Sequence, residues 1–203
     1  MIYCIGDSHV SFFSGSDKMI RTYPFVGRSK YFTCARLSPM TAHNSMNYAE
    51  VILLVSSKIN VRSSDYVLLP LGETDCRAEF FPIKQLVGDG IHNAISETVD
   101  RYVKTILYLG NTRNILVWGV HGAGKSPGYG KGSQEERNII IREFNEKLST
   151  LCDENNIPFI CIFDDMVDGN ITKDGWLDAD NIHLGQTSMP FVIEKFKELG
   201  LIK

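Results

Sequence analysis

The amino-acid sequence predicts a three-layer α/β/α sandwich with a five-stranded parallel sheet in flavodoxin-like order. Short apolar runs of the kind that form buried parallel strands alternate along the chain with longer helical stretches. The length of 203 residues and the hydrophobic content of 43% suit one domain, residues 1–203, with a full core.

Five apolar runs are the expected strands. The first ends at Gly6 and the third ends at Gly72, as buried strands bounded by glycine do. The full set covers residues 2–5, 31–37, 66–71, 114–120 and 157–163. Because ligands of such sheets bind beyond the carboxyl ends of the strands, the residues that follow the strands are the candidates for a site.

Four stretches are the expected helices. Thr41 is a suitable N-cap for the first of them, and Gly110 and Gly200 stand where the second and the last should end. The full set covers residues 41–58, 91–109, 135–154 and 189–199.

The composition argues against several classes of protein. The net charge of −3 argues against a nucleic-acid binder that relies on overall basicity. The sequence shows no run long enough to cross a membrane and no basic leader followed by a long apolar stretch. Its five cysteines are widely spread, without the spacing of a zinc site. We therefore expect a cytoplasmic protein with reduced thiols, no cofactor or metal, and no nucleic-acid or membrane partner.

Two short segments at opposite ends of the chain carry the groups that acyl transfer needs. Ser8 follows the first strand within Gly6-Asp7-Ser8-His9, and His183 closes Asp180-Asn181-Ile182-His183. A serine hydroxyl becomes a good nucleophile when a histidine takes its proton, and the histidine works best when a carboxylate fixes its tautomer. Either segment alone suits an ordinary turn, but together they favour a Ser-His-Asp triad.

These segments resemble the outer sequence blocks of the SGNH (GDSL-type) hydrolases. Leu37-Ser38-Pro39-Met40-Thr41-Ala42 falls at the second block of that family, and Gly72-Glu73-Thr74-Asp75-Cys76-Arg77 falls at the third. The third block is similar to the Gly-Glu-x-Asp-Cys-Arg form of a subgroup of SGNH-like proteins, several of them linked to polysaccharides. Gly175-Trp176-Leu177, before the last block, fits as well.

The resemblance implies a role for each residue of the blocks. Ser8 would be the nucleophile, His183 the general base and then acid, and Asp180 the residue that orients His183. Backbone N–H groups of Ser8 and Ser38 would hold the oxyanion, with Ser38 standing where the family has glycine. Thr74 stands where the family has an asparagine that donates to the oxyanion. The loss of one such donor can cost about a hundredfold to a thousandfold in rate.

Other residues of the same strand edge have less specific roles. Arg77 would either contact an anionic or sugar substrate or join Glu73 and Asp75 in an ion-pair network that supports the loop. His9 is expected at a helix start. The remaining candidates for substrate contact are Gly72 and His121.

A competing interpretation concerns residues 119–126, Gly-Val-His-Gly-Ala-Gly-Lys-Ser, which have the letters of a Walker A phosphate loop. Residues 159–165 resemble a Walker B strand. A phosphate loop must open directly into a helix, whereas Pro127 and three more glycines follow. Glycine costs about 1 kcal/mol at each helical position. The sequence favours a glycine-rich loop beside the active site, with Lys125 or Lys131 available to the substrate.

The sequence as a whole predicts a serine esterase or acyltransferase for O-acyl esters of a small molecule or a saccharide. An acetyl group on a sugar is the substrate that the family resemblance favours. Two alternatives stay open: a non-catalytic carbohydrate-binding protein that keeps the fold, and a P-loop nucleotide-binding protein.

Overall fold

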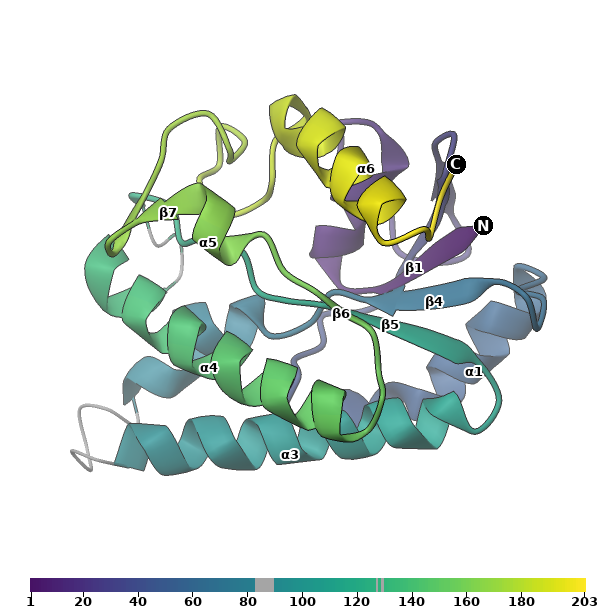
Figure 1. Cartoon of the computed structure of the whole chain (residues 1–203), viewed down its shortest axis with the longest axis horizontal. Coiled ribbons are helices and arrows are strands. Elements are labelled where there is room, and N and C mark those ends of the chain that lie inside the picture. The colour runs from purple at the N-terminus through teal and green to yellow at the C-terminus, as the bar shows by residue number, and fades with distance from the viewer. Residues whose placement is uncertain (83–89, 127, 129) are drawn as a thin grey trace.

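The computed structural model of the protein describes residues 1–82, 90–126, 128 and 130–203. Its centre is a six-stranded sheet in the order β2-β3-β1-β4-β5-β6 (Figure 1). The strands are β1 (Ile2–Gly6), β2 (Val26–Arg28), β3 (Phe32–Arg36), β4 (Tyr66–Leu69), β5 (Asn114–Trp118) and β6 (Phe159–Ile160). From β3 to β6 all neighbours pair in parallel, so the expected flavodoxin-like order is confirmed.

The prediction of five strands misses one edge strand. β2 pairs with β3 in the antiparallel direction, with Val26 opposite Ala35 and Arg28 opposite Thr33. Its three residues are half-buried or exposed. A short edge strand needs no apolar run, so the hydrophobic pattern that found the other strands could not find this one.

Helices cover both faces of the sheet, which confirms the three-layer architecture. α1 (Ala49–Lys58), α3 (Gly90–Gly110) and α4 (Gln134–Glu154) lie on one face. α6 (Met189–Glu198) and the 3-10 helix η1 (Ser8–Ser14) lie on the other (Figure 1). The shorter elements are η2 (Ser45–Tyr48), the π-helical turn η3 (Asp75–Glu79), α5 (Phe163–Met166), η4 (Gln186–Ser188) and a hairpin of β7 (Val167–Asp168) and β8 (Ile171–Thr172).

The helix expected over residues 41–58 begins only at Ala49. Asp75, from a distant segment, accepts the backbone N–H groups of Ala42 and His43 at 2.7 and 3.2 Å. These hydrogen bonds hold residues 42–44 in turns, and the 3-10 helix η2 follows before α1 begins. The local periodicity is therefore overridden by a tertiary contact.

The strand expected over residues 157–163 is also shorter than predicted. β6 covers only Phe159–Ile160, and α5 begins soon afterwards at Phe163. Phe163 is 2% exposed, so the apolar run is buried although part of it is helical. Periodicity alone does not distinguish a short buried strand from a buried helical turn.

A cluster of aromatic rings fixes η1 against the sheet. Phe13 of η1 packs against Phe32 and Trp118, with ring centroids 5.2 Å away in both cases. Phe196 of α6 packs against the same two rings at 5.3 and 6.1 Å. Burial of such a side chain contributes about 1.5–3 kcal/mol. The cluster therefore holds the start of η1, and with it Ser8, at the carboxyl edge of the sheet.

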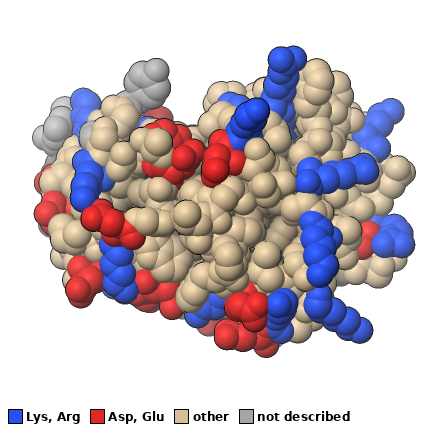
Figure 2. Space-filling model, turned by 90° about the horizontal axis from the view of Figure 1, so that it is seen from above, with Lys and Arg blue, Asp and Glu red and all other residues tan. Residues whose placement is uncertain are grey.

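Charged side chains are unevenly distributed over the face shown in Figure 2. Lys and Arg are more numerous toward the right-hand end, where Figure 1 places both chain termini, and Asp and Glu are mixed with them elsewhere.

None of the helices described here combines the length and the apolar character that a membrane span requires.

Candidate active site

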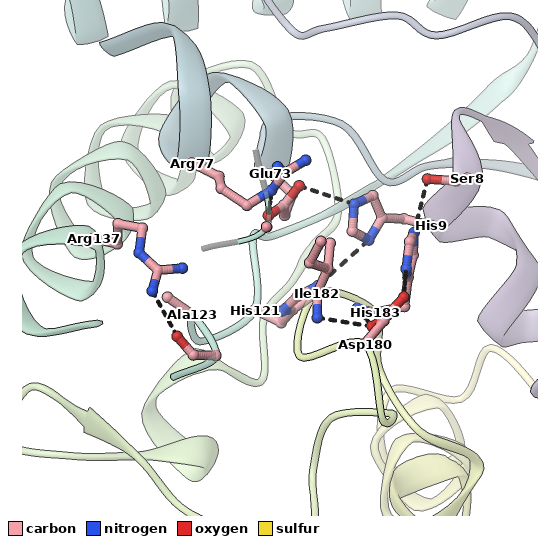
Figure 3. Close-up of polar contacts among 12 residues, drawn as sticks. Ser8, His9, Glu73, Arg77, His121, Ala123, Arg137, Asp180, Ile182 and His183 are labelled. Atoms are coloured by element: carbon pink, nitrogen blue, oxygen red, sulfur yellow. Dashed lines mark hydrogen bonds and ion pairs between the residues drawn. The ribbon is translucent and has the colours of Figure 1, made fainter. Parts of the chain in front are cut away.

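Ser8, His183 and Asp180 form a continuous chain of hydrogen bonds (Figure 3). Ser8 Oγ lies 2.8 Å from His183 Nε2, and His183 Nδ1 lies 2.6 Å from Asp180 Oδ2. An ionised carboxylate can only accept a hydrogen bond, so Nδ1 carries the imidazole proton. Nε2 therefore has a free lone pair directed at the Ser8 hydroxyl, which is the tautomer that a general base needs.

The start of η1 presents the Ser8 hydroxyl. β1 ends at Gly6, and Asp7 caps η1 by accepting the backbone N–H of His9 at 2.9 Å. Ser8 is therefore the first residue of the helix. The N–H of a first helical residue has no acceptor within the helix, so it is available to a ligand.

One carboxylate both shapes the 180–183 loop and orients its histidine. Asp180 Oδ1 accepts the backbone N–H groups of Ile182 and His183 at 2.8 and 2.9 Å, while Oδ2 binds the imidazole. Asn181 has a φ of 58°, a left-handed conformation that asparagine adopts more readily than most residues. The segment Asp-Asn-Ile-His thus builds this turn from its own side chains.

The pKa values of His183 and Asp180 are both shifted downwards. Burial and the positive charge of His9 lower the pKa of His183, although Asp180 acts in the opposite direction. Burial alone would raise the pKa of Asp180, but hydrogen bonds from the backbone and side chain of His183 lower it. Near neutral pH, His183 is therefore neutral and Asp180 is charged.

A second chain of polar side chains lies beside His183 (Figure 3). The ring centroids of His9 and His183 are 4.6 Å apart. His9 Nε2 lies 3.1 Å from Glu73 Oε2, and Arg77 Nε donates to Glu73 Oε1 at 2.7 Å. On its other side, His9 Nδ1 lies 3.4 Å from His121 Nε2. No group of three or more His, Cys, Asp or Glu side chains in the described part of the chain is arranged to hold a metal ion.

Burial and neighbouring charges shift the pKa values of His9, Glu73 and His121 in different directions. Burial would lower the pKa of His9, but the charges of Asp7 and Glu73 outweigh it and raise that pKa above the ordinary value. It would raise the pKa of Glu73, but His9 and Arg77 lower that pKa to about 2. For His121, burial and the charge of His9 act together and lower the pKa to about 4.

Asp75 does not join the expected ion-pair network. Its buried carboxylate accepts the N–H groups of Ala42 and His43, and burial raises its pKa to about 7. Arg77 pairs instead with Glu73, which lies four residues earlier on the same helical turn. Of the three residues of the expected network, Glu73 and Arg77 pair with each other, and Glu73 also pairs with His9.

The remaining candidates follow neighbouring strands at the same edge. β1 and β3 end side by side, with Gly6 opposite Arg36, and Ser38 is an exposed residue just beyond β3. Thr74 follows β4 and is half-buried. His121 follows β5 and is only 4% exposed, so its ring contacts His9 from inside the protein.

Gly72 sets the position of the turn that carries Glu73 and Thr74. Its φ is 117°, and a Cβ atom there would lie 2.7 Å from Phe144 Cε1 and 2.9 Å from Val120 Cγ2. Both the backbone conformation and the space require glycine. Gly72 therefore lets this turn pack closely against α4.

The glycine-rich loop is held by side chains of α4. Asn145 Oδ1 accepts the N–H of Val120, and Asn138 Oδ1 accepts the N–H of Ala123, both at 2.8 Å. Two N–H groups that could bind a phosphate are thus already used, and α4 begins only after the glycines. These contacts argue against a Walker A loop, which presents its N–H groups to phosphate and opens directly into a helix.

The same loop packs against the 180–183 loop. Arg137 of α4 donates to Gly124 O at 2.7 Å, and Gly124 packs so closely on the carbonyl of Asn181 that a Cβ has no room there. Lys125 forms an exposed ion pair with Asp174 at 2.8 Å. Contact of Lys125 or Lys131 with a substrate stays a prediction, and residues 127 and 129 lie outside the described part.

Comparison with known proteins shows which solved structures share the fold. No family model and no curated protein matches the chain. A GDSL-like lipase from Bacteroides thetaiotaomicron is 13% identical with a TM-score of 0.63, over 98% of this chain and 86% of the lipase. A carbohydrate acetylesterase from Sinorhizobium meliloti is 18% identical with a TM-score of 0.56, over 99% of both chains. An acetyl xylan esterase is 17% identical with a TM-score of 0.60, over 98% of this chain and 99% of that one.

The fold is that of GDSL-type esterases and lipases. Within this fold the structure brings Ser8, His183 and Asp180 together, as the sequence predicts. It also brings together His9 and Glu73, a partnership that the sequence analysis missed. The available signal was the presence of histidine directly after Ser8 together with glutamate directly after Gly72, because both positions follow neighbouring strands.

Proposed function

We propose that the chain is a serine esterase or acyltransferase for O-acyl esters. The observation that carries the proposal is the unbroken hydrogen-bond chain from Ser8 through His183 to Asp180. The hydroxyl, imidazole and carboxylate have the order and the tautomer of a Ser-His-Asp triad. The fold shared with esterases and lipases supports the proposal.

In the first half-reaction, Ser8 Oγ attacks the carbonyl carbon of the ester while His183 Nε2 takes the hydroxyl proton. Asp180 stabilises the imidazolium that forms. The proposed donors to the oxyanion are the N–H groups of Ser8 and Ser38 and the hydroxyl of Thr74. Collapse of the tetrahedral intermediate breaks the bond to the alcohol oxygen, and the alcohol leaves with the proton from His183.

In the second half-reaction, water or an acceptor hydroxyl attacks the acyl group on Ser8. His183 takes the proton of the attacking group and returns it to Ser8 Oγ as the new acid or ester departs. Hydrolysis and acyl transfer thus differ only in the attacking group.

We propose O-acetyl groups on carbohydrate as the substrate class. Two proteins with this fold are described as a carbohydrate acetylesterase and an acetyl xylan esterase, which supports this choice. A binding protein without catalysis is the alternative. The hydrogen bond between Ser8 and the unprotonated nitrogen of His183 favours catalysis, because binding alone does not require that tautomer.

A fluorophosphonate probe and a panel of p-nitrophenyl esters and acetylated saccharides test the proposal. We expect the probe to label Ser8, and Ser8→Ala to lower turnover by at least about a thousandfold because the covalent route is lost. Ser16→Ala, at an exposed serine beyond η1, is the matched control and should keep full turnover. A Ser8→Ala protein with near-normal turnover contradicts the proposal. Saccharide binding without labelling or turnover would favour the binding protein.

A further inference from the structure

The hydrogen bonds around His9 determine where its protons lie. Glu73, with a pKa of about 2, is a carboxylate that can only accept, so His9 Nε2 carries a proton toward it at 3.1 Å. His121 Nδ1 lies 3.1 Å from the carbonyl oxygen of Gly122, which also can only accept. In the neutral ring, His121 Nε2 is therefore an acceptor, and His9 Nδ1 faces it at 3.4 Å. Both ring nitrogens of His9 are then donors.

An alternative places the shared proton on His121, and the surroundings of the two rings argue against it. Glu73 accepts directly from His9, and the carboxylate of Asp7 also raises the pKa of His9. His121 is 4% exposed, and the hydrogen bonds of its ring go to a carbonyl and to His9. A cation on His121 would lose its hydration without a carboxylate in contact, which is costly.

We propose that His9 is held as a doubly protonated imidazolium and that its buried positive charge keeps His183 neutral and ready to act as the base. This inference rests on the proposed esterase function. The two rings are 4.6 Å apart and His9 is only 8% exposed, so water and salt screen the charge poorly. Protonation of His183 would place two cations side by side. His9 thus opposes Asp180, whose charge favours a proton on His183.

The other charged groups near His9 do not cancel the effect of its charge on the pKa of His183. Glu73 carries one negative charge but faces two cations, His9 and Arg77. Arg77 lowers the pKa of His9, and the carboxylate of Asp7 raises it. At His183 the charge of His9 has a larger effect on the pKa than the opposing charge of Glu73. His9 therefore acts through His183 and is a positioning residue for the proton, whereas Ser8 and His183 contact the reacting atoms.

Nitrogen NMR of protein whose histidine rings carry an NMR-active nitrogen isotope tests the charge on His9 without any substrate. We expect His9 to show two protonated ring nitrogens at about pH 7, well above the pKa of His121, and His121 to show one. A His9 ring with an unprotonated Nδ1 overturns the proposal, whether or not the protein proves to be an esterase.

The variant His9→Gln tests the effect on His183. It removes the charge and keeps an amide that can donate to Glu73. We expect the NMR titration of His183 to move up by about one pH unit. The base works only when it is deprotonated, so the rate of Ser8 labelling by fluorophosphonate falls as the pH drops through the pKa of His183. A raised pKa therefore moves this acid limb to higher pH by the same amount.

His92→Gln is the matched control, because His92 is an exposed histidine that pairs with Glu143 on α4. It should leave the titration of His183 unchanged. Glu73→Gln is the second variant. Without the Glu73 carboxylate, the pKa of His9 falls although Asp7 still raises it, and His183 should again titrate higher.

The outcomes separate this proposal from the proposed function. An unchanged titration of His183 in a folded His9→Gln or Glu73→Gln protein overturns the proposal. A lower labelling rate at every pH, with no shift of the acid limb, indicates a merely structural role and also overturns it. If no probe labels Ser8 in any variant, the esterase function fails, and the NMR titration of His183 still decides the role of His9.

Discussion

Two carboxylate–imidazole pairs lie side by side in this molecule, Asp180 with His183 and Glu73 with His9. They use the same chemical groups at similar nitrogen–oxygen distances, 2.6 and 3.1 Å. Their exposure differs, because the side chain of Asp180 is 42% exposed and that of Glu73 is 10% exposed. The second ring nitrogen also faces a different partner, the hydroxyl of Ser8 in one pair and the ring of His121 in the other.

The group that faces the second ring nitrogen explains why His183 and His9 have different proposed roles. A hydroxyl can donate its proton to the imidazole, so the pair of Asp180 and His183 is suited to proton transfer. A neutral imidazole whose other nitrogen already donates can only accept, so His9 keeps both of its protons. The same two residue types thus suit two different proposed roles, a base in the pair whose carboxylate is exposed and a fixed charge in the pair whose carboxylate is buried.

The largest expected effect is a loss of turnover in a variant that removes the carboxylate of the exposed pair. Asp180→Asn should leave the fold intact and lower turnover by about ten-thousandfold, because an amide can stabilise the wrong tautomer of His183. Steady-state kinetics with a p-nitrophenyl ester measures the loss. Asp174→Asn, at an exposed aspartate paired with Lys125, is the control. An Asp180→Asn protein as fast as the unmodified one would remove Asp180 from the mechanism.

The next prediction concerns the free energy of unfolding, which should depend more on the buried pair of Glu73 and His9 than on the exposed pair of Asp180 and His183. Glu73→Gln should lower the free energy of unfolding by about 3 kcal/mol near pH 7, since folding moves the pKa of Glu73 from 4.5 to about 2. The folded pKa is the lower one, so this stabilisation is present above the unfolded value of 4.5 and is lost as the pH falls toward 2. Asp180→Asn should cost less than about 1 kcal/mol, because exposed ion pairs are screened by solvent.

Urea titrations followed by the fluorescence of the two tryptophans measure both free energies over a range of pH. The difference between Glu73→Gln and the unmodified protein should shrink in acid. Equal losses for the two variants at neutral pH would show that burial does not separate the two pairs.

A third, smaller effect tests the group that lies next to Glu73 in sequence. Thr74→Ala should lower kcat by about a hundredfold with little change in KM, because a donor to the oxyanion acts only in the transition state. Thr74→Ser keeps the hydroxyl and should retain most of the activity. If the alanine and serine variants are equally active, the backbone N–H groups alone hold the oxyanion.

The smallest effect is expected at Lys125, which belongs to neither pair. Lys125→Ala should change KM by less than about fivefold, as the loss of one exposed ion pair does. Calorimetry should show no binding of Mg-ATP to the unmodified protein, because Asn138 and Asn145 already hold the loop. Lys197→Ala on α6 is the control. ATP binding that Lys125→Ala abolishes would restore the phosphate-loop interpretation.

The main sheet followed from the sequence because buried parallel strands require apolar runs, and β1, β3, β4 and β5 have them. β2 lacks such a run, since an edge strand pairs on one side only and its residues stay partly exposed. The early end of β6 and the late start of α1 were missed for a related reason. Periodicity reports burial, and it does not register that Ala42 and His43, in the first turn of the expected helix, donate to Asp75.

The site shows the same difference between contacts within one short segment and contacts between segments that are distant in the sequence. Asp180 and His183 lie in one turn whose side chains fold it, and Ser8 follows a strand, so the sequence alone could nominate all three. It could not tell that Glu73 pairs with Arg77 and His9 while Asp75 faces backbone N–H groups, because these acidic residues are separated by a single position. Which of them faces a cation is decided by the strands and helices that pack around each, and the neighbouring charges together with burial then shift the pKa of each carboxyl group. The sequence by itself nominated the three residues of the proposed triad, and the tertiary structure decided that His9 faces Glu73 and His121 while His183 faces Asp180 and Ser8, because these partners come from separate strands and loops.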